Sequence, residues 1–186
     1  MKNFDLIKKE IESQLKKSEL ELDNEHSQLT RKWVLKQKPD ADIPLQIAAL
    51  AHDYERSFPN RERSESYNSY EQYKQVHAKK GAKMVADLMM KYNFSSDDIK
   101  KVKYLIENHE VGGSDGDLQI LTNADSLSYF EGSVPWYRKT HSEKQTVDKI
   151  VFMYKRMSKN VRKFIEQVKF EDKELNKLYQ NAINNL

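Results

Sequence analysis

The sequence has 186 residues, of which 38% are hydrophobic, 10% are aromatic and 33% are charged. This length predicts a single domain, and the aromatic content argues against disorder. The absence of cysteine excludes disulfides, thiolate metal sites and a cysteine nucleophile, and the net charge of +3 is too small to indicate nucleic-acid binding by itself. No apolar run approaches the ~20 residues that span a bilayer, and the charged N-terminus lacks the apolar stretch of a signal peptide, so we expect a cytoplasmic protein without a membrane partner.

The first part of the chain is predicted to be helical, because glycine and proline are scarce and apolar residues recur at helical spacing. We expect amphipathic helices over residues 2–22 and 25–38. A nearly all-apolar helix then begins at Asp42-Ile43-Pro44, with proline in its first turn, and ends at His52-Asp53. Such a helix is buried on most sides, so we place it at the centre of the fold. Residues 55–70 are polar and are predicted to form a loop or short turns.

The second part of the chain is also predicted to be helical, with no strand. Further helices are expected over residues 71–91, after a cap at Ser95 or Ser96, and over residues 118–130. Gly132 and Pro135 predict a loop over residues 131–141. The pattern Ser142-x-x-Gln145 resembles a capping box, and it opens helices that run to the C-terminus with a break near residues 158–172.

Four of the five histidines lie on the apolar faces of four different predicted helices: His26, His52, His77 and His109. One such histidine is more often a core residue than a ligand. Burying four imidazoles costs desolvation free energy unless each finds a partner, and a shared metal ion would be such a partner. The set therefore favours convergence on a metal.

Two aspartates strengthen this interpretation. Asp53 directly follows His52, and Asp125 lies in a largely apolar segment. Aspartate is rarely buried without a partner. Imidazole and carboxylate ligands without thiolate suit Fe, Mn, Zn, Co or Ni.

The order His26, His52-Asp53, His77, His109, Asp125 resembles that of the HD-domain superfamily. The segments ALAHDYERSFP, YKQVHAKKGAKMV, LIENHEVGG and NADSLSYF also resemble uncharacterised bacterial members of that superfamily. The resemblance implies an all-α fold, a single helical bundle over residues 1–186 with the His-Asp helix at its centre. The motif-bearing core would cover residues 24–158, with helical extensions over 1–23 and 159–186.

The resemblance also implies a ligand set for one or two divalent ions, with Mg added to the metals above. His26, His52 and Asp125 would form one site, and His77 with His109 would form the second. Asp53 would bridge the two.

Most characterised relatives are phosphohydrolases, so the resemblance implies a metal-dependent hydrolase that acts on a nucleotide or another small phosphate ester through a metal-bound hydroxide. Asp53 and Arg56 are the candidate catalytic residues, since a cation beside the metals would stabilise the developing charge. The candidate substrate-binding cations are Arg31, Arg56, Arg61 and Lys80. The arginines of the predicted substrate loop could instead form surface ion pairs with Glu55, Glu62 and Glu65. Some relatives place a catalytic glutamate where this chain has Arg56, which makes an acid role for Glu55 doubtful.

Two other functions remain open. The same six-ligand order occurs in HD-type di-iron oxygenases that act on a small polyol or phosphonate, and a degenerate domain could bind a nucleotide without turnover. Three further features each have a structural and a functional interpretation. The tyrosine row could pack on the core or form a stacking platform, and Trp136-Tyr137 could pack or form a lid. The two loop acids could be solvated or bind a metal. The residues of these three features are Tyr67, Tyr70 and Tyr73, Trp136 and Tyr137, and Asp115 and Asp117.

Overall fold

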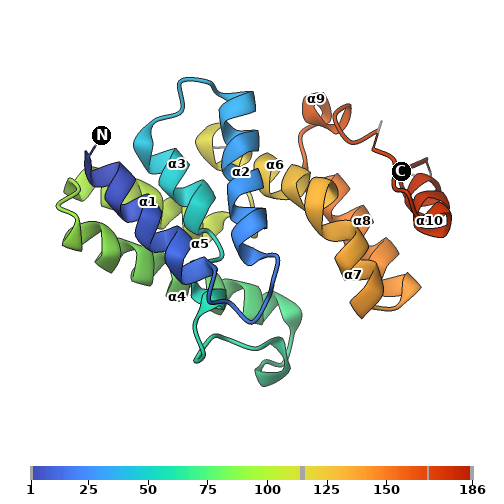
Figure 1. Ribbon diagram of the computed structural model, residues 1–186, viewed down its shortest axis with the longest axis horizontal. Helices are drawn as coiled ribbons and strands as arrows, with labels where there is room; N and C mark the ends of the chain where they lie inside the picture. Colours follow the sequence, from blue (N-terminus) through green and yellow to red (C-terminus); the bar gives the residue numbers. More distant parts are fainter. Residues whose placement is uncertain (1, 114–115, 167, 185–186) are drawn as a thin grey trace.

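The computed structural model describes residues 2–113, 116–166 and 168–184, and over these ranges the chain forms an all-α helical bundle (Figure 1). No β-strand occurs within the described ranges. The α-helices are α1 (Lys2–Leu15), α2 (Asp23–Gln37), α3 (Ile43–Ala51), α4 (Tyr70–Lys91), α5 (Ser96–Asn108), α6 (Gly116–Ser128), α7 (Val134–Thr140), α8 (Glu143–Arg156), α9 (Lys159–Arg162) and α10 (Lys173–Asn184). Shorter turns are the 3₁₀ segments η1 (Tyr54–Ser57) and η2 (Ser64–Ser66) and the π-helical segment η3 (Tyr129–Ser133).

Helix α3 lies at the centre of the bundle, as its apolar sequence predicts. The Asp42 carboxylate caps it by accepting a hydrogen bond from the backbone N–H of Leu45 at 3.0 Å, and Pro44 lies in the first turn, where a missing N–H costs nothing. Every residue from Leu45 to Ala51 except Gln46 is buried. Helices α1, α2, α5 and α6 all pack against α3.

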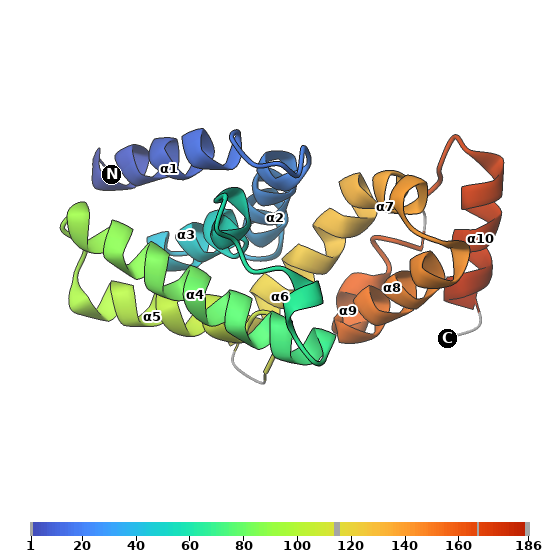
Figure 2. The same ribbon diagram turned by 90° about the horizontal axis from the view of Figure 1, so that it is seen from below.

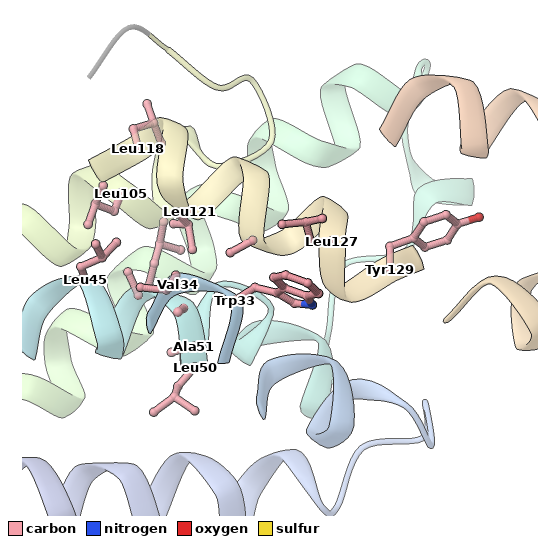
Figure 3. Packing of buried hydrophobic residues seen from close by; sticks show 14 of the residues in the cluster. Trp33, Val34, Leu45, Leu50, Ala51, Leu105, Leu118, Leu121, Leu127 and Tyr129 are labelled. Atoms are coloured by element: carbon pink, nitrogen blue, oxygen red, sulfur yellow. The ribbon is translucent and has the colours of Figure 1, made fainter. Parts of the chain in front are cut away.

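The core around α3 is built from leucine and other aliphatic side chains. Figure 3 shows Val34 of α2, Leu45 of α3, Leu105 of α5 and Leu121 of α6 meeting in one cluster. Each of these four residues is at most 1% exposed. Burial of each such side chain contributes about 1.5–3 kcal/mol.

Two helix pairs flank α3. Helices α4 and α5 lie side by side on one side of it, with α1 on the opposite side (Figure 2). Helices α2 and α6 pack against each other as the second pair. The C-terminal end of α3, which leads into His52-Asp53, therefore lies between the two pairs.

The C-terminal helices extend the molecule away from this core (Figures 1 and 2). Helix α10 packs on α8, and the Tyr179 hydroxyl donates to the Ile165 carbonyl at 2.6 Å. The capping box at Ser142 and Gln145 and the break after α8 are both confirmed.

Two predicted boundaries are wrong. Residues 131–141 are not a loop: η3 continues α6 and α7 follows it directly. A Cβ at Gly132 would lie 2.9 Å from Leu29 Cδ1, so this glycine allows Leu29 its present position, and Pro135 lies in the first turn of α7, where it does not break a helix. Helix α1 ends at Leu15 instead of continuing to residue 22. The Ser18 hydroxyl accepts from the Leu20 N–H, a local bond that competes with the helix.

No helix in the described part of the chain is long and apolar enough to cross a membrane.

Candidate metal centre

The structure brings together all six side chains predicted as ligands, in two groups. The first group is His26, His52 and Asp125, and the second is Asp53, His77 and His109; within each group the candidate ligand atoms lie within 4.8 Å of one another. Five of the six residues are buried, and His26 is half-buried.

The first group is assembled from α2, the end of α3 and α6. His26 Nε2 lies 3.2 Å from His52 Nε2 and 3.1 Å from Asp125 Oδ1. His52 Nε2 lies 3.8 Å from the same Asp125 oxygen. Three donor atoms therefore face one point.

The second group is assembled from the end of α3, α4 and the end of α5. Asp53 Oδ1 lies 3.1 Å from His77 Nε2 and 3.9 Å from His109 Nε2. The other oxygen of this carboxylate, Oδ2, lies 3.6 Å from His52 Nε2 in the first group. Asp53 thus presents one oxygen to each group, which is the arrangement that a bridging carboxylate needs.

The outward-facing nitrogens identify the tautomers of the histidines. The Nδ1 atoms of His52 and His109 lie 3.0 Å and 2.7 Å from the carbonyl oxygens of Ala49 and Ile106. A carbonyl can only accept, so these Nδ1 atoms carry the proton, and each Nε2 has a free lone pair.

The same holds for the other two histidines. His77 Nδ1 lies 3.1 Å from a carboxylate oxygen of Glu55, which accepts. His26 Nδ1 lies 3.0 Å from the Ser128 hydroxyl, whose own proton goes to the Asp125 carbonyl at 2.7 Å. All four Nε2 lone pairs therefore point inward, with the other nitrogen fixed by an outer partner, as is typical of metal-ligating histidines.

This donor set fits a bound metal ion. In these tautomers the Nε2 lone pairs of His26 and His52 face each other at 3.2 Å, where they repel. A cation between them relieves the repulsion. A metal ion can accept all three donor atoms of the first group at once, whereas a proton bridges only two.

Two arginines balance the charge of the aspartates. Arg56 donates to Asp53 Oδ2 at 2.6 Å, and Arg156 donates to Asp125 Oδ2 at 2.9 Å. Burial alone would raise the pKa of each carboxyl group, but the guanidinium charge and the nearby histidines outweigh burial and hold both pKa values well below their usual range. Both aspartates are therefore ionised and available as ligands at neutral pH.

The histidines differ in protonation. Burial lowers the pKa of His109 to about 4, so this imidazole is neutral at pH 7. Burial also opposes protonation of His26 and His77, but the carboxylates that contact them outweigh it and raise both pKa values. A proton and a metal ion would compete for these two residues.

A cleft of about 370 Å³ opens onto the two groups, and its walls come from α2, η1, α4, α7 and α8. Its charged lining residues are four carboxylates, Asp23, Asp53, Glu110 and Asp125, and three cations, Arg56, Lys149 and Arg156. Aromatic residues line it as well: Tyr70, Tyr73, Tyr129, Trp136 and Tyr137.

Of the four predicted substrate-binding cations, the structure brings only Arg56 to the cleft within the described residues. Arg31 hydrogen-bonds to Gln46 at 2.8 Å, and Arg61 pairs with Glu19 at 3.4 Å. Lys80 donates to the Asn60 carbonyl at 2.6 Å and also pairs with Glu55 and Glu62, so it lies behind the second group instead of in front of it.

Several residues of the site were not predicted. Glu55 is fully buried and supports His77 from behind, a role different from the acid role considered for it. Ser128, Lys149 and Arg156 were also missed. The spacing of Lys149, Met153 and Arg156 on α8 is the available signal, because residues at i, i+4 and i+7 share one helix face.

Of the remaining residues with two interpretations, some line the cleft and others do not. Tyr70, Tyr73, Trp136 and Tyr137 line the cleft, whereas the Tyr67 hydroxyl bonds to Glu62. Asp117 accepts from Lys38 at 2.9 Å and from Lys101 at 2.5 Å, so it forms an ion-pair cluster on the surface of the bundle. Asp115 lies outside the described residues.

Comparison with known proteins gives a family without an assigned activity. Neither the search of curated proteins nor the search of solved structures gave a match. The model of the family described as a domain of unknown function, DUF4202, matches residues 3–178. This match covers nearly the whole chain, and the chain therefore belongs to the DUF4202 family.

Proposed function

We propose that this protein is a metal-dependent phosphohydrolase of the HD-domain type, which acts on a nucleotide or another small phosphate ester. The observation that carries the proposal is the position of Asp53. Its two oxygens face two separate ligand groups, at 3.1 Å from His77 Nε2 and 3.6 Å from His52 Nε2.

The residues that would hold the metal are the six of the two groups. When bound, a pair of divalent ions supplies Lewis acidity, which activates water and withdraws charge from a phosphoryl group. The chain itself directs the Nε2 atoms of the four histidines inward, and it keeps the aspartates ionised through Arg56 and Arg156. No serine or cysteine nucleophile is then required.

Arg56 would orient the substrate. One of its nitrogens is held by Asp53, and the side chain lines the cleft, so its remaining N–H groups can donate to a phosphoryl oxygen. The buried Nε of Arg56 has no hydrogen-bond partner within the described chain. A planar guanidinium fork matches phosphate oxygens better than a lysine does.

The charge of the cleft favours an anionic substrate over a neutral polyol. Four carboxylates and three cations line it, and two divalent ions would convert this small negative excess into a positive one. An anion such as a phosphate ester is then attracted. A polyol would gain nothing from this charge, which favours the hydrolase over an oxygenase that acts on a polyol.

A metal and substrate screen tests the proposal. Metal-free protein is loaded separately with Mn, Co, Mg, Ni or Fe, its metal content is measured, and phosphate release is followed from nucleotides and other small phosphate esters. We expect metal-stimulated phosphate release with at least one ion. Dioxygen uptake together with a mixed-valence iron signal would instead support the oxygenase. Full metal content with neither reaction would support a non-catalytic binding domain.

A further inference from the structure

Lys149 is a cleft cation that neither ligand group uses. It lies on α8 and lines the cleft together with Met153 and Arg156. Each of the other two cleft cations has a carboxylate partner: Arg56 pairs with Asp53, and Arg156 pairs with Asp125. Among the described residues, none forms an ion pair or hydrogen bond with the Lys149 amine.

The surroundings of Lys149 hold it without neutralising it. The amine lies 5.4 Å from the ring centre of Phe152 and 5.9 Å from that of Tyr129. Such cation–π contacts attract the ammonium but leave its three N–H donors free. Glu110, the carboxylate that acts most strongly on the charge of Lys149, is already shared by Arg56 at 3.7 Å and Lys74 at 3.9 Å.

A second unused donor lies beside it. Tyr129 is 4% exposed and lines the same cleft, and its hydroxyl has no hydrogen-bond partner within the described chain. A buried hydroxyl without a partner costs free energy, so a ligand that accepts from it gains correspondingly. Lys149 and Tyr129 both line the cleft, and neither the ammonium nor the buried hydroxyl has a hydrogen-bond partner within the described chain, so the two groups form a donor pair for an anionic oxygen.

We propose that Lys149 and the Tyr129 hydroxyl form the binding site for an anionic oxygen of the substrate phosphate, on the α8 side of the cleft. This inference rests on the proposed function, and it assigns the substrate anion to a part of the site that the metal ligands do not form. Burial lowers the pKa of Lys149 in spite of the nearby carboxylates, which indicates an amine withdrawn from bulk water. A charge-assisted hydrogen bond is strong in such surroundings.

Calorimetric titration of the Mn-loaded protein with inorganic phosphate tests the inference. Lys149→Met keeps the length of the side chain and removes its charge, and we expect it to weaken phosphate binding about tenfold or more. Lys149→Arg should restore most of the affinity. Tyr129→Phe should weaken binding about fivefold, since it removes a neutral donor.

The matched control is Lys144→Met, on the same helix, where the lysine is exposed and pairs with Asp148 at 2.7 Å. It should leave phosphate binding unchanged. Metal content and thermal unfolding of every variant show whether the fold and the metal centre persist. Where Lys149→Met unfolds, Tyr129→Phe tests the same site, because it removes only the hydroxyl and should still weaken phosphate binding.

Three results would overturn the inference. They are unchanged phosphate affinity in Lys149→Met with full metal content, an equal loss in Lys144→Met, or no phosphate binding by the wild-type protein. These differ from failure of the proposed function, which shows as no phosphate release from any ester. A protein that binds phosphate through Lys149 and hydrolyses nothing would keep this inference and contradict that function.

Discussion

The two ligand groups differ in what supports their histidines. In the first group, neutral acceptors hold the rings: the Ser128 hydroxyl behind His26 and a backbone carbonyl behind His52. In the second group, a backbone carbonyl also holds His109, but His77 donates to the fully buried carboxylate of Glu55, which Lys80 contacts at 3.0 Å. A carboxylate behind an imidazole makes the ring a more basic ligand than a hydroxyl does.

This difference shows that each group has its own helices and its own supports. The first depends on the α2–α6 pair and the second on the α4–α5 pair, and both pairs meet at the end of α3. His52 and Asp53 are adjacent in sequence but belong to different groups. The two groups should therefore be separable by mutation, except at Asp53, which faces both.

The largest effect is expected at this shared residue. Asp53→Ala removes an oxygen from both groups and leaves Arg56 without its carboxylate, so the protein should lose most of its metal and its activity. Elemental analysis of the purified, folded variant measures this loss. Asp148→Ala, which removes an exposed carboxylate on α8, is the control and should keep the full metal content. A folded Asp53→Ala protein with full metal content would remove Asp53 from the ligand set.

Paired double variants should separate the groups. His77→Gln/His109→Gln should lose about one metal equivalent, because only the second group is dismantled. His26→Gln/His52→Gln should lose the other. Metal content per chain, measured beside circular dichroism, gives the answer. If either double variant binds as much metal as the wild type, its two histidines are core residues and the centre is mononuclear at most.

The supporting residues should have smaller effects, and each should act on one group. Glu55→Gln replaces the carboxylate behind His77, and it should weaken the metal site of the second group by roughly 10–100-fold. Ser128→Ala should do the same to the first group, at the lower end of that range because the lost acceptor is neutral. Metal titration that resolves two binding events measures both. Equal weakening of the two events by one variant would contradict the separation of the groups.

The smallest effect is expected from Arg56, which would contact the substrate and supports no histidine. Arg56→Ala should lower kcat/KM for a phosphate ester by about tenfold or more, since charge-assisted hydrogen bonds contribute ~1.5–3 kcal/mol. Arg61→Ala is the matched control, because Arg61 pairs with Glu19 away from the cleft. Equal kinetics in the two variants would remove Arg56 from substrate binding.

Much of the core of the site could be predicted from the sequence, because its residues carry local signals. His52 and Asp53 end an almost wholly apolar helix, and His77 and His109 interrupt apolar faces, so each is conspicuous as a polar residue in a buried position. The capping residues of α3, α5 and α8 were predictable for a similar reason, since a cap is a contact within a few residues of the chain.

The cations of the site were not predictable in the same way. Arg61 and Lys80 lie close in sequence to the ligands but face away from the cleft, while Arg156 reaches Asp125 from 31 residues further along the chain. A charged side chain finds its partner through helix packing, which local spacing does not encode. Gly132 did not predict a loop correctly for a related reason: it lies within η3, packed against Leu29 of α2, and the helix continues through it.

Two histidine–aspartate groups that each hold a metal ion and share Asp53 would give two metal positions in a crystal. Anomalous X-ray scattering from crystals of the Mn-loaded protein tests this arrangement most directly. We expect two anomalous peaks, one in contact with the Nε2 atoms of His26 and His52 and one in contact with those of His77 and His109, with an oxygen of Asp53 at each. If no anomalous density lies at either pair of Nε2 atoms, the histidines and aspartates do not form a metal centre. This holds whether the crystals contain manganese elsewhere or none at all.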